Sequence, residues 1–296
     1  MPIPESKLET WSHQGAVTTS RDTYASVKRA VTSASSGYAD KSVEVFLQGS
    51  YANDTNIRGD SDVDIVVMLD SIFRGHVAGL PPEQVRAYNQ AYDTATYLFS
   101  QFKDAVVAQL RLVYGAQSAQ TGHKSVKLPA GSGRLGADIV VCHQYRDYQR
   151  FRSIDDQQYD EGIFFPTAYA SEVVNYPKQH RDNCTRKHQQ TGEWFKPTVR
   201  VFKNIRGVLV DRGVLSKEKA PSYFIEGMLY NVPNDQFGNS YAATVLGCIG
   251  WVLKADWAAF VCANEKHSLL GPSSVQWSRE NCLAFLKAVL ELWKLG

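Results

Sequence analysis

The chain has 296 residues, of which 44% are hydrophobic and 21% are charged, enough to build two modest cores, so we expect two domains. The net charge of +2 argues against a protein that coats long nucleic acids or an acidic membrane. No window reaches the roughly 18 apolar residues of a membrane helix. The five cysteines are scattered and form no CxxC pair, which is typical of reduced thiols in a cytoplasmic protein.

Helical and strand patterns alternate in the first part of the chain. Residues 5–15 and 18–34 have patterns typical of helices. Residues 43–48 (VEVFLQ) and 63–69 (VDIVVML) predict strands, and the β-branched content of the second indicates a buried one. Pro81-Pro82 then begins a long helix, in which apolar residues recur at helical spacing as far as Val106.

The character of the sequence changes in its second half. Residues 125–128 and 137–142 (ADIVVC) predict two more strands of the same sheet. From about Ser171 onward long helical patterns follow, without a convincing strand. We therefore expect an α/β (α+β) domain over residues 1–167 and a helical domain over residues 168–296, with a ligand cleft between them.

Three aspartates stand at the starts of apolar strands. Asp62 and Asp64 are two positions apart, so the period of a strand places both side chains on one face. Such carboxylates repel each other unless a cation neutralises them, and oxygen ligands suit a hard ion such as Mg²⁺. Asp138 begins another apolar strand and completes a two-metal site if the two strands are neighbours. The alternative is that these aspartates are ordinary turn residues.

A glycine and a serine precede the aspartates. Gly49 and Ser50 follow the strand 43–48. A glycine lets the backbone approach a phosphate closely, and a serine hydroxyl can donate a hydrogen bond to it. This arrangement predicts a phosphate-binding turn, with Gln48 beside it.

The run GSYANDTNIRGDSDVDIVV resembles the Gly-Ser and Asp-h-Asp-h signature of the polymerase-β-like nucleotidyltransferases, in which Asp138 corresponds to the usual third carboxylate. The chain length and the helical second half resemble the bacterial CD-NTases, relatives of cGAS and oligoadenylate synthetase. The resemblance extends over about residues 40–235. It implies a mixed-sheet catalytic domain over residues 1–167, with its N-terminal helices, and a helical nucleotide-binding domain over residues 168–296.

The resemblance also implies an activity. CD-NTases condense nucleoside triphosphates into cyclic or linear oligonucleotide messengers in CBASS anti-phage defence and release pyrophosphate. We expect two Mg²⁺ ions, for which Mn²⁺ can substitute, to be held by Asp62, Asp64 and Asp138. ATP is the expected substrate together with UTP, and cyclic UMP-AMP is one expected product. Neither a membrane nor an extended nucleic acid is an expected partner.

Basic residues line one side of a predicted helix. Lys196, Arg200 and Lys203 are spaced by four and three positions. A solvated basic face and an anion site remain alternatives for these residues. The resemblance implies that Lys203 grips the donor triphosphate and that Arg200 lies on the same face.

Three further residues acquire roles through the resemblance. Ser222 and Tyr223 resemble a Ser-Tyr pair in cGAS, in which the serine binds the terminal phosphates and the tyrosine stacks on the base. An N-cap serine and a core tyrosine are the alternatives. Asn175 is similar in position to an asparagine that selects uracil in some CD-NTases, although Asn-Tyr-Pro is also typical of a turn.

Two further patterns stay open. His180, Cys184 and His188 lie on one face of a predicted helix and could hold zinc, but no fourth ligand is evident. Gly296 at the end of the chain would permit conjugation by a ubiquitin-like system or contact with an effector. A tRNA-modifying, protein-modifying or antibiotic-type nucleotidyltransferase and a catalytically silent nucleotide-binding or RNA-binding module are the rival functions.

Overall fold

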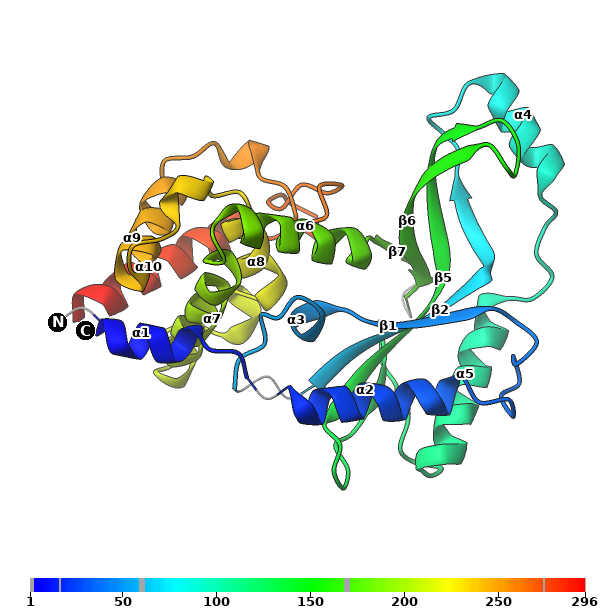
Figure 1. Cartoon of the computed structure of the whole chain (residues 1–296), viewed down its shortest axis with the longest axis horizontal. Helices are drawn as coiled ribbons and strands as arrows, with labels where there is room; N and C mark the ends of the chain where they lie inside the picture. Colours follow the sequence, from blue (N-terminus) through cyan, green and yellow to red (C-terminus); the bar gives the residue numbers. More distant parts are fainter. Residues whose placement is uncertain (1–2, 16, 59–61, 168–170, 274, 296) are drawn as a thin grey trace. The chain divides into compact units, whose positions relative to one another are not determined.

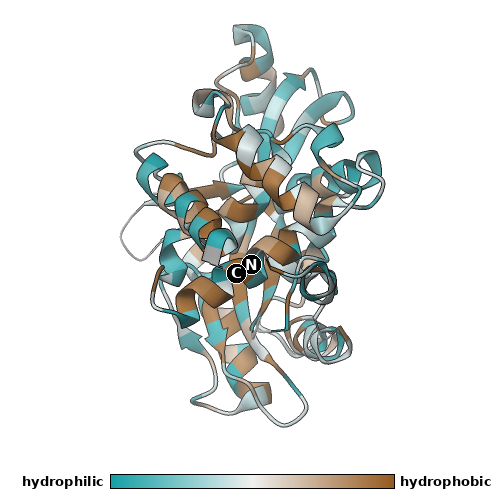
Figure 2. Ribbon diagram, turned by 90° about the vertical axis from the view of Figure 1, so that its left-hand side faces the viewer, coloured by the Kyte–Doolittle hydropathy of each residue, from teal (hydrophilic) through white to brown (hydrophobic). Residues whose placement is uncertain are grey.

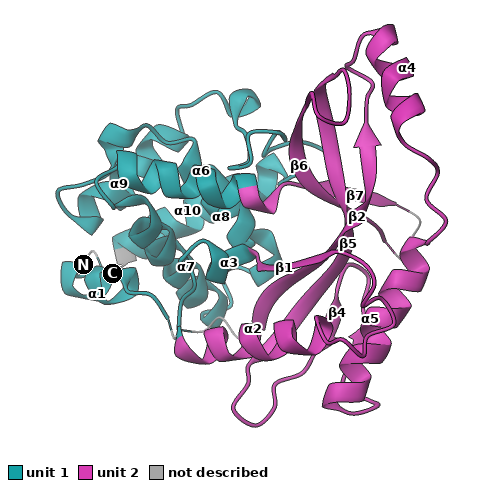
Figure 3. Ribbon diagram, turned by 45° about the vertical axis from the view of Figure 1, so that its right-hand side comes forward, with its two compact units in different colours: residues 1–17, 49–60, 179–296 teal, residues 18–48, 61–178 magenta. Residues whose placement is uncertain are grey.

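A computed structural model describes residues 3–15, 17–58, 62–167, 171–273 and 275–295 (Figure 1). The chain forms two compact units (Figure 3). The sheet unit comprises residues 18–48 and 61–178, and the helical unit comprises residues 1–17, 49–60 and 179–296. Gly296, the residue considered for conjugation, lies outside the described residues.

The sheet unit is built on one mixed sheet. Its strands are β1 (Val43–Leu47), β2 (Asp62–His76), β3 (Gln120–Thr121), β4 (Val126–Leu128), β5 (Gly136–Phe151), β6 (Gln157–Pro166) and β7 (Glu172–Asn175). The order is β1-β2-β5-β4-β3, and β6 pairs with both β5 and β7. The β2–β5 pair is parallel and the other pairs are antiparallel. A parallel pair needs a long crossover connection, and here it contains two helices.

One face of the sheet carries an apolar layer. The period of two places Asp62, Asp64, Val66 and Met68 on the same face of β2. Val66 and Met68 belong to a buried cluster that also contains Phe46, Val140, Cys142, Ile163 and Phe165. Helices α2 (Thr18–Val31) and α5 (Phe99–Tyr114) pack against each other and against β2 and β5, on one side of the sheet (Figure 1).

The long helix predicted from Pro81 to Val106 is wrong. The structure has α4 (Pro82–Ala91) and α5, separated by residues 92–98. The side chain of Gln101 accepts a hydrogen bond of 2.7 Å from the backbone N–H of Leu98. This bond satisfies a donor at the start of α5 and so favours a new helix there.

In the helical unit, several helices pack around α7. Its helices are α1 (Glu5–Ser12), α3 (Gly49–Ala52), α6 (Pro177–Gln190, whose first two residues belong to the sheet unit), α7 (Phe195–Asp211), α8 (Ser222–Tyr230), α9 (Tyr241–Val252) and α10 (Arg279–Leu295). Helix α7 contacts α1, α8, α9 and α10, and its Phe195, Phe202 and Ile205 lie in the core. The helices carry both hydrophobic and hydrophilic residues along their lengths (Figure 2), as expected of elements that bury one side.

The mixed α+β fold with a helical second half is confirmed, but the boundaries of the two units differ from those predicted. A strand, β7, forms after Ser171, where none is predicted, because it pairs with β6. The sheet unit therefore continues to Lys178, beyond the expected boundary at Thr167. Residues 1–17 belong to the helical unit, since α1 packs on α7 and α9. No helix among the described residues has the length and apolarity needed to cross a membrane.

Candidate active site

The three aspartates lie on two neighbouring strands. Asp64 of β2 and Asp138 of β5 are register partners in the parallel pair, where strands lie about 4.8 Å apart. Asp62 precedes Asp64 on the same face and is the register partner of Gly136. Asp62 is exposed, and Asp64 and Asp138 are half-buried. The condition under which Asp138 joins Asp62 and Asp64, that their strands be neighbours, is therefore met.

Two residues that the sequence did not single out shape this group. The Ser125 hydroxyl donates a hydrogen bond of 3.2 Å to Asp138 Oδ1 and so orients that carboxylate. A Cβ on Gly136 would lie 2.2 Å from Asp62 Oδ1. Glycine at this position therefore leaves room for the Asp62 carboxylate against the neighbouring strand.

The donor set of the three aspartates fits a divalent cation. All the candidate ligand atoms are carboxylate oxygens, which hard ions such as Mg²⁺ prefer. Like charges on adjacent strands are costly to hold together unless a cation lies between them. Asp62, Asp64 and Asp138 are therefore the residues that would hold such an ion.

A pocket of about 300 Å³ lies in the sheet unit over the same face. It is lined by Gln48, Asp64, Lys124, Ser125, Asp138, Val140, Ile163, Phe165, Val173 and Asn175. Carboxylates, amides and a lysine thus share one cavity with four apolar side chains, the mixture that small-molecule sites need for affinity and orientation.

Two roles are predicted for Asn175, base recognition and turn formation, and its position is compatible with both. It lies at the end of β7, lines the pocket with Asp64 and Asp138, and accepts a hydrogen bond of 2.9 Å at Oδ1 from the backbone N–H of Tyr176. This bond fixes the side chain just before α6, as expected of a turn residue. Its contact with a base stays a prediction.

Gly49 and Ser50 begin the four-residue helix α3 just after β1, and we call these two residues the Gly49-Ser50 turn. Gly49 has a φ of 65°, in the left-handed region that glycine adopts without strain. The carbonyl groups of Gly49 and Ser50 accept bonds of 3.1 and 2.9 Å from the backbone N–H groups of Asn53 and Thr55. In the sheet unit, the backbone N–H of Gln48 donates to the Asp64 carbonyl at 3.0 Å. The phosphate roles of Gln48, Gly49 and Ser50 stay predictions.

The basic residues of α7 are buried, so the solvated alternative is wrong. Lys196 Nζ lies 2.9 Å from Asp54 Oδ2, and Lys203 Nζ donates to the Thr55 carbonyl at 2.9 Å. The Arg200 guanidinium donates to the carbonyls of Ser12 and Asp54. In this structure the basic stripe therefore holds backbone and side chains of the protein, and its contact with phosphate stays a prediction.

Ser222 and Tyr223 begin α8. Pro221 occupies the N-cap, so the alternative of an N-cap serine is wrong, and the Ser222 hydroxyl accepts a bond of 3.2 Å from Arg206. The Tyr223 ring stacks on His180, with 5.1 Å between the ring centres. Burial raises the pKa of the Tyr223 hydroxyl. The roles of Ser222 and Tyr223 toward phosphate and base stay predictions.

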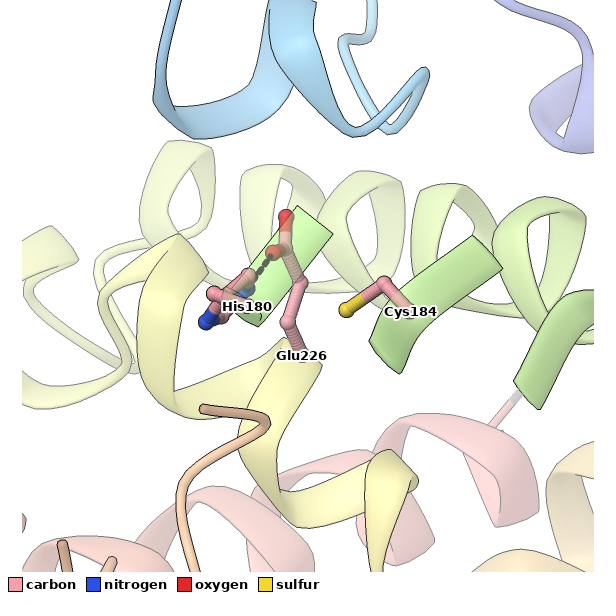
Figure 4. A group of neighbouring side chains, drawn as sticks. All are labelled: His180, Cys184 and Glu226. Carbon is pink, nitrogen blue, oxygen red and sulfur yellow. Dashed lines mark hydrogen bonds and ion pairs between the residues drawn. The ribbon is translucent and has the colours of Figure 1, made fainter. Parts of the chain in front are cut away.

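The zinc hypothesis named His180, Cys184 and His188, but the structure groups His180 and Cys184 with Glu226. His180, Cys184 and Glu226 are buried, with ligand atoms within 4.8 Å of one another (Figure 4), whereas His188 does not belong to the group. Structural zinc needs four ligands at about 2.0–2.3 Å, and the described members of this group number three. Burial raises the pKa of the Cys184 thiol, and Glu226 already accepts three hydrogen bonds. The group therefore does not fit a zinc site.

Comparisons with known proteins agree with this geometry. Residues 182–294 match the model of the cGAS/DncV-like nucleotidyltransferase C-terminal helical domain, and residues 27–105 match the nucleotidyltransferase domain. A cyclic UMP-AMP synthase from Rhodothermus marinus is 42% identical over 99% of this chain and 98% of its own.

Two further relatives extend the comparison. The structure of a Rhodothermus marinus CdnE c-UMP-AMP synthase with Apcpp and Upnpp superposes with a TM-score of 0.89 at 43% identity, over 99% of this chain and 97% of the other. A cyclic dipurine nucleotide synthase from Elizabethkingia meningoseptica is 31% identical over 84% of each chain. With the three aspartates, the pocket and the helical unit described, these comparisons show that the chain belongs to the CD-NTase family of nucleotidyltransferases.

Proposed function

We propose that this chain joins UTP and ATP into a cyclic dinucleotide and releases pyrophosphate, as a messenger synthase of anti-phage defence. The observation that carries the proposal is the register pair Asp64 and Asp138 in a pocket that also contains Asn175. The full-length similarity to a cyclic UMP-AMP synthase supports the same substrate pair.

The proposed reaction is the attack of a ribose 3′- or 2′-hydroxyl on the α-phosphorus of a second nucleotide. Asp138 takes the hydroxyl proton as general base, and Ser125 holds the Asp138 carboxylate in orientation. The new P–O bond forms as the bond to pyrophosphate breaks, and a second round closes the ring. Two Mg²⁺ ions, or Mn²⁺ in their place, held by Asp62, Asp64 and Asp138 would activate the hydroxyl and stabilise charge on the phosphates.

The residues that bind nucleotide are part of the proposal. Gln48, Gly49, Ser50 and Ser222 would contact phosphates, and Tyr223 would stack on a base. Arg200 and Lys203 donate to carbonyl groups of the protein in this structure. A phosphate role for these two residues therefore requires that those bonds be exchanged for bonds to phosphate.

The choice of bases is assigned to Asn175. Its amide offers one donor and one acceptor, which match the O4 and N3–H edge of uracil. The same amide could pair with adenine through N6 and N7. A relative at 31% identity is a cyclic dipurine synthase, so the bases differ among similar proteins and must be set by individual pocket residues.

A transferase that modifies tRNA or protein is the rival function. The test is to incubate the purified chain with Mg²⁺ and pairs of the four NTPs, one of them labelled at the α-phosphate, with and without added tRNA or protein. We expect a phosphatase-resistant product with the mass of cyclic UMP-AMP from UTP and ATP. Label that enters only an added macromolecule, or that gives only phosphatase-sensitive products, would exclude the proposal.

A further inference from the structure

Four buried charged side chains converge on residues 53–55, in the loop between Gly49-Ser50 and the Asp62 strand. We call Lys196, Arg200, Lys203 and Glu226 the loop clamp. Lys196 pairs with the Asp54 side chain, Arg200 and Lys203 donate to the carbonyls of Asp54 and Thr55, and Glu226 accepts from the side chains of Asn53 and Thr55. All four clamp residues are at most 9% exposed.

Glu226 is the acceptor of this clamp. Its carboxylate accepts hydrogen bonds from Thr55 Oγ1 at 2.5 Å, Asn53 Nδ2 at 2.9 Å and His180 Nε2 at 3.0 Å. Burial alone would raise the pKa of Glu226, but the hydrogen bond and charge of His180, the charge of Lys203 and the Thr55 hydroxyl together hold it below its ordinary value. Three converging donors are best met by an ionised carboxylate, which has acceptors only.

The clamped loop is bonded directly to the Gly49-Ser50 turn. The backbone N–H groups of Asn53 and Thr55 donate to the carbonyls of Gly49 and Ser50. Asp54, between them, has a φ of 55°, a conformation that costs a non-glycine residue energy and persists when its surroundings enforce it. A loop held at each of three successive residues therefore fixes the backbone of the turn.

We infer that Glu226 is a positioning residue for nucleotidyl transfer: through Asn53 and Thr55 it holds the Gly49-Ser50 turn in the conformation that receives the nucleotide phosphates. The inference rests on the phosphate role proposed above for this turn. Lys203 and Arg200 of α7 hold the same loop, because they donate hydrogen bonds to the backbone carbonyls of Thr55 and Asp54.

The experiment compares Glu226→Gln, Asn53→Asp and the double variant in the full-length chain with Mg²⁺. Each single change disturbs the Asn53–Glu226 bond or the charge beside Lys203, whereas the double variant keeps one donor, one acceptor and one negative charge. We expect each single variant to raise KM for ATP by about tenfold, as for the loss of a hydrogen bond to a charged group. The double variant should recover most of this loss.

Amide hydrogen exchange of the peptide that covers residues 49–56 gives a readout without turnover. Exchange there should be faster in the single variants and return toward that of the wild type in the double variant. This measurement tests the clamp even if the wild type makes no cyclic dinucleotide, a result that would overturn the proposed function instead.

Glu5→Gln is the matched control, because the Glu5 carboxylate also accepts two bonds in the helical unit, from the backbone N–H groups of Tyr241 and Ala242. It should lower Tm while leaving KM and the exchange of residues 49–56 unchanged. Wild-type KM and exchange in Glu226→Gln would overturn the inference. So would a double variant no better than the single ones, or a Glu5→Gln variant with the same rise in KM.

Discussion

Two groups of carboxylates in this chain have opposite surroundings. Asp62, Asp64 and Asp138 stand side by side on one face of the sheet, with Asp64 and Asp138 in the wall of a pocket. Glu226 is 3% exposed and accepts hydrogen bonds from three donors of the protein. The comparison teaches that burial together with several protein donors distinguishes the carboxylate that holds the fold from the carboxylates that adjoin a pocket.

The largest effect is expected where the carboxylates adjoin the pocket. Asp62→Asn combined with Asp64→Asn removes the proposed metal ligands, and their loss should cost several kcal/mol of transition-state stabilisation, or about a thousandfold in rate. Stability should stay equal or rise, because like charges are removed. Product assays with Mg²⁺ and with Mn²⁺, together with thermal unfolding, check both parts. Wild-type turnover in the double variant would contradict a role for Asp62 and Asp64 in the reaction.

The opposite result is expected at the loop clamp. Lys203→Met leaves the Thr55 carbonyl without the Lys203 donor and removes a positive charge near Glu226, so it should lower the free energy of unfolding by on the order of 3 kcal/mol. Urea unfolding measures this change. Lys254→Met, at an exposed position of the helical unit, is the control and should change stability little. Equal stabilities of the two variants would show that the clamp does not hold the fold.

A substitution of Asn175 tests which residue of the pocket selects the bases. Asn175→Ser removes the amide proposed to read uracil, which should cost about 1–3 kcal/mol of discrimination and shift incorporation toward purines. Pairwise NTP assays with products identified by mass measure the shift. An unchanged product profile would leave Asn175 as the turn residue that its bond to Tyr176 also describes.

A smaller effect is expected next to Asp62. Gly136→Ala places a Cβ against Asp62 Oδ1 and should turn that carboxylate away from its position. We expect kcat to fall by roughly tenfold, less than the 10²-fold that a 1 Å misplacement can cost, because the end of a side chain can swing. Gly79→Ala is the control, since a Cβ there meets nothing within 4 Å. Equal kcat in the two variants would contradict the claim that the close approach of Gly136 to Asp62 matters for the reaction.

The smallest effect is a pH dependence of stability. The pKa of Glu226 is lowered in the folded state, so its stabilisation is present above the unfolded pKa of about 4.3 and is lost as the pH falls through the folded value. The Tm deficit of Glu226→Gln relative to the wild type should therefore narrow as the pH falls below about 4.3. A deficit that narrows between pH 7 and pH 5 would mean that Glu226 is not the group concerned.

The aspartate site was predictable because strand periodicity is local. Two aspartates at a spacing of two, before β-branched residues, fix a shared face, and a second such strand supplies Asp138. The break between α4 and α5 was not predictable from periodicity, because the apolar spacing continues through Ala95 and Leu98. β6 and β7 lack a strong strand pattern of their own and form by pairing with β5 and with each other.

Glu226 escaped prediction for a different reason. Its partners Asn53 and Thr55 lie more than 170 residues away in the sequence, so no local pattern connects them. One signal was available: Glu226 is the single charged residue in the otherwise apolar helix SYFIEGMLY, and a buried charge needs partners. The cations of α7 were found as a stripe, but their facing the loop at residues 54–55 depended on the tertiary fold.

The most direct test of the central claim measures turnover and thermal stability together in Asp64→Asn and Glu226→Gln, with UTP, ATP and Mg²⁺. The account predicts that Asp64→Asn makes no detectable cyclic product and melts at or above the wild-type temperature. Glu226→Gln should still make product, with a raised KM, and melt at a lower temperature. The reverse pattern, with turnover in Asp64→Asn and wild-type KM and stability in Glu226→Gln, would contradict the account.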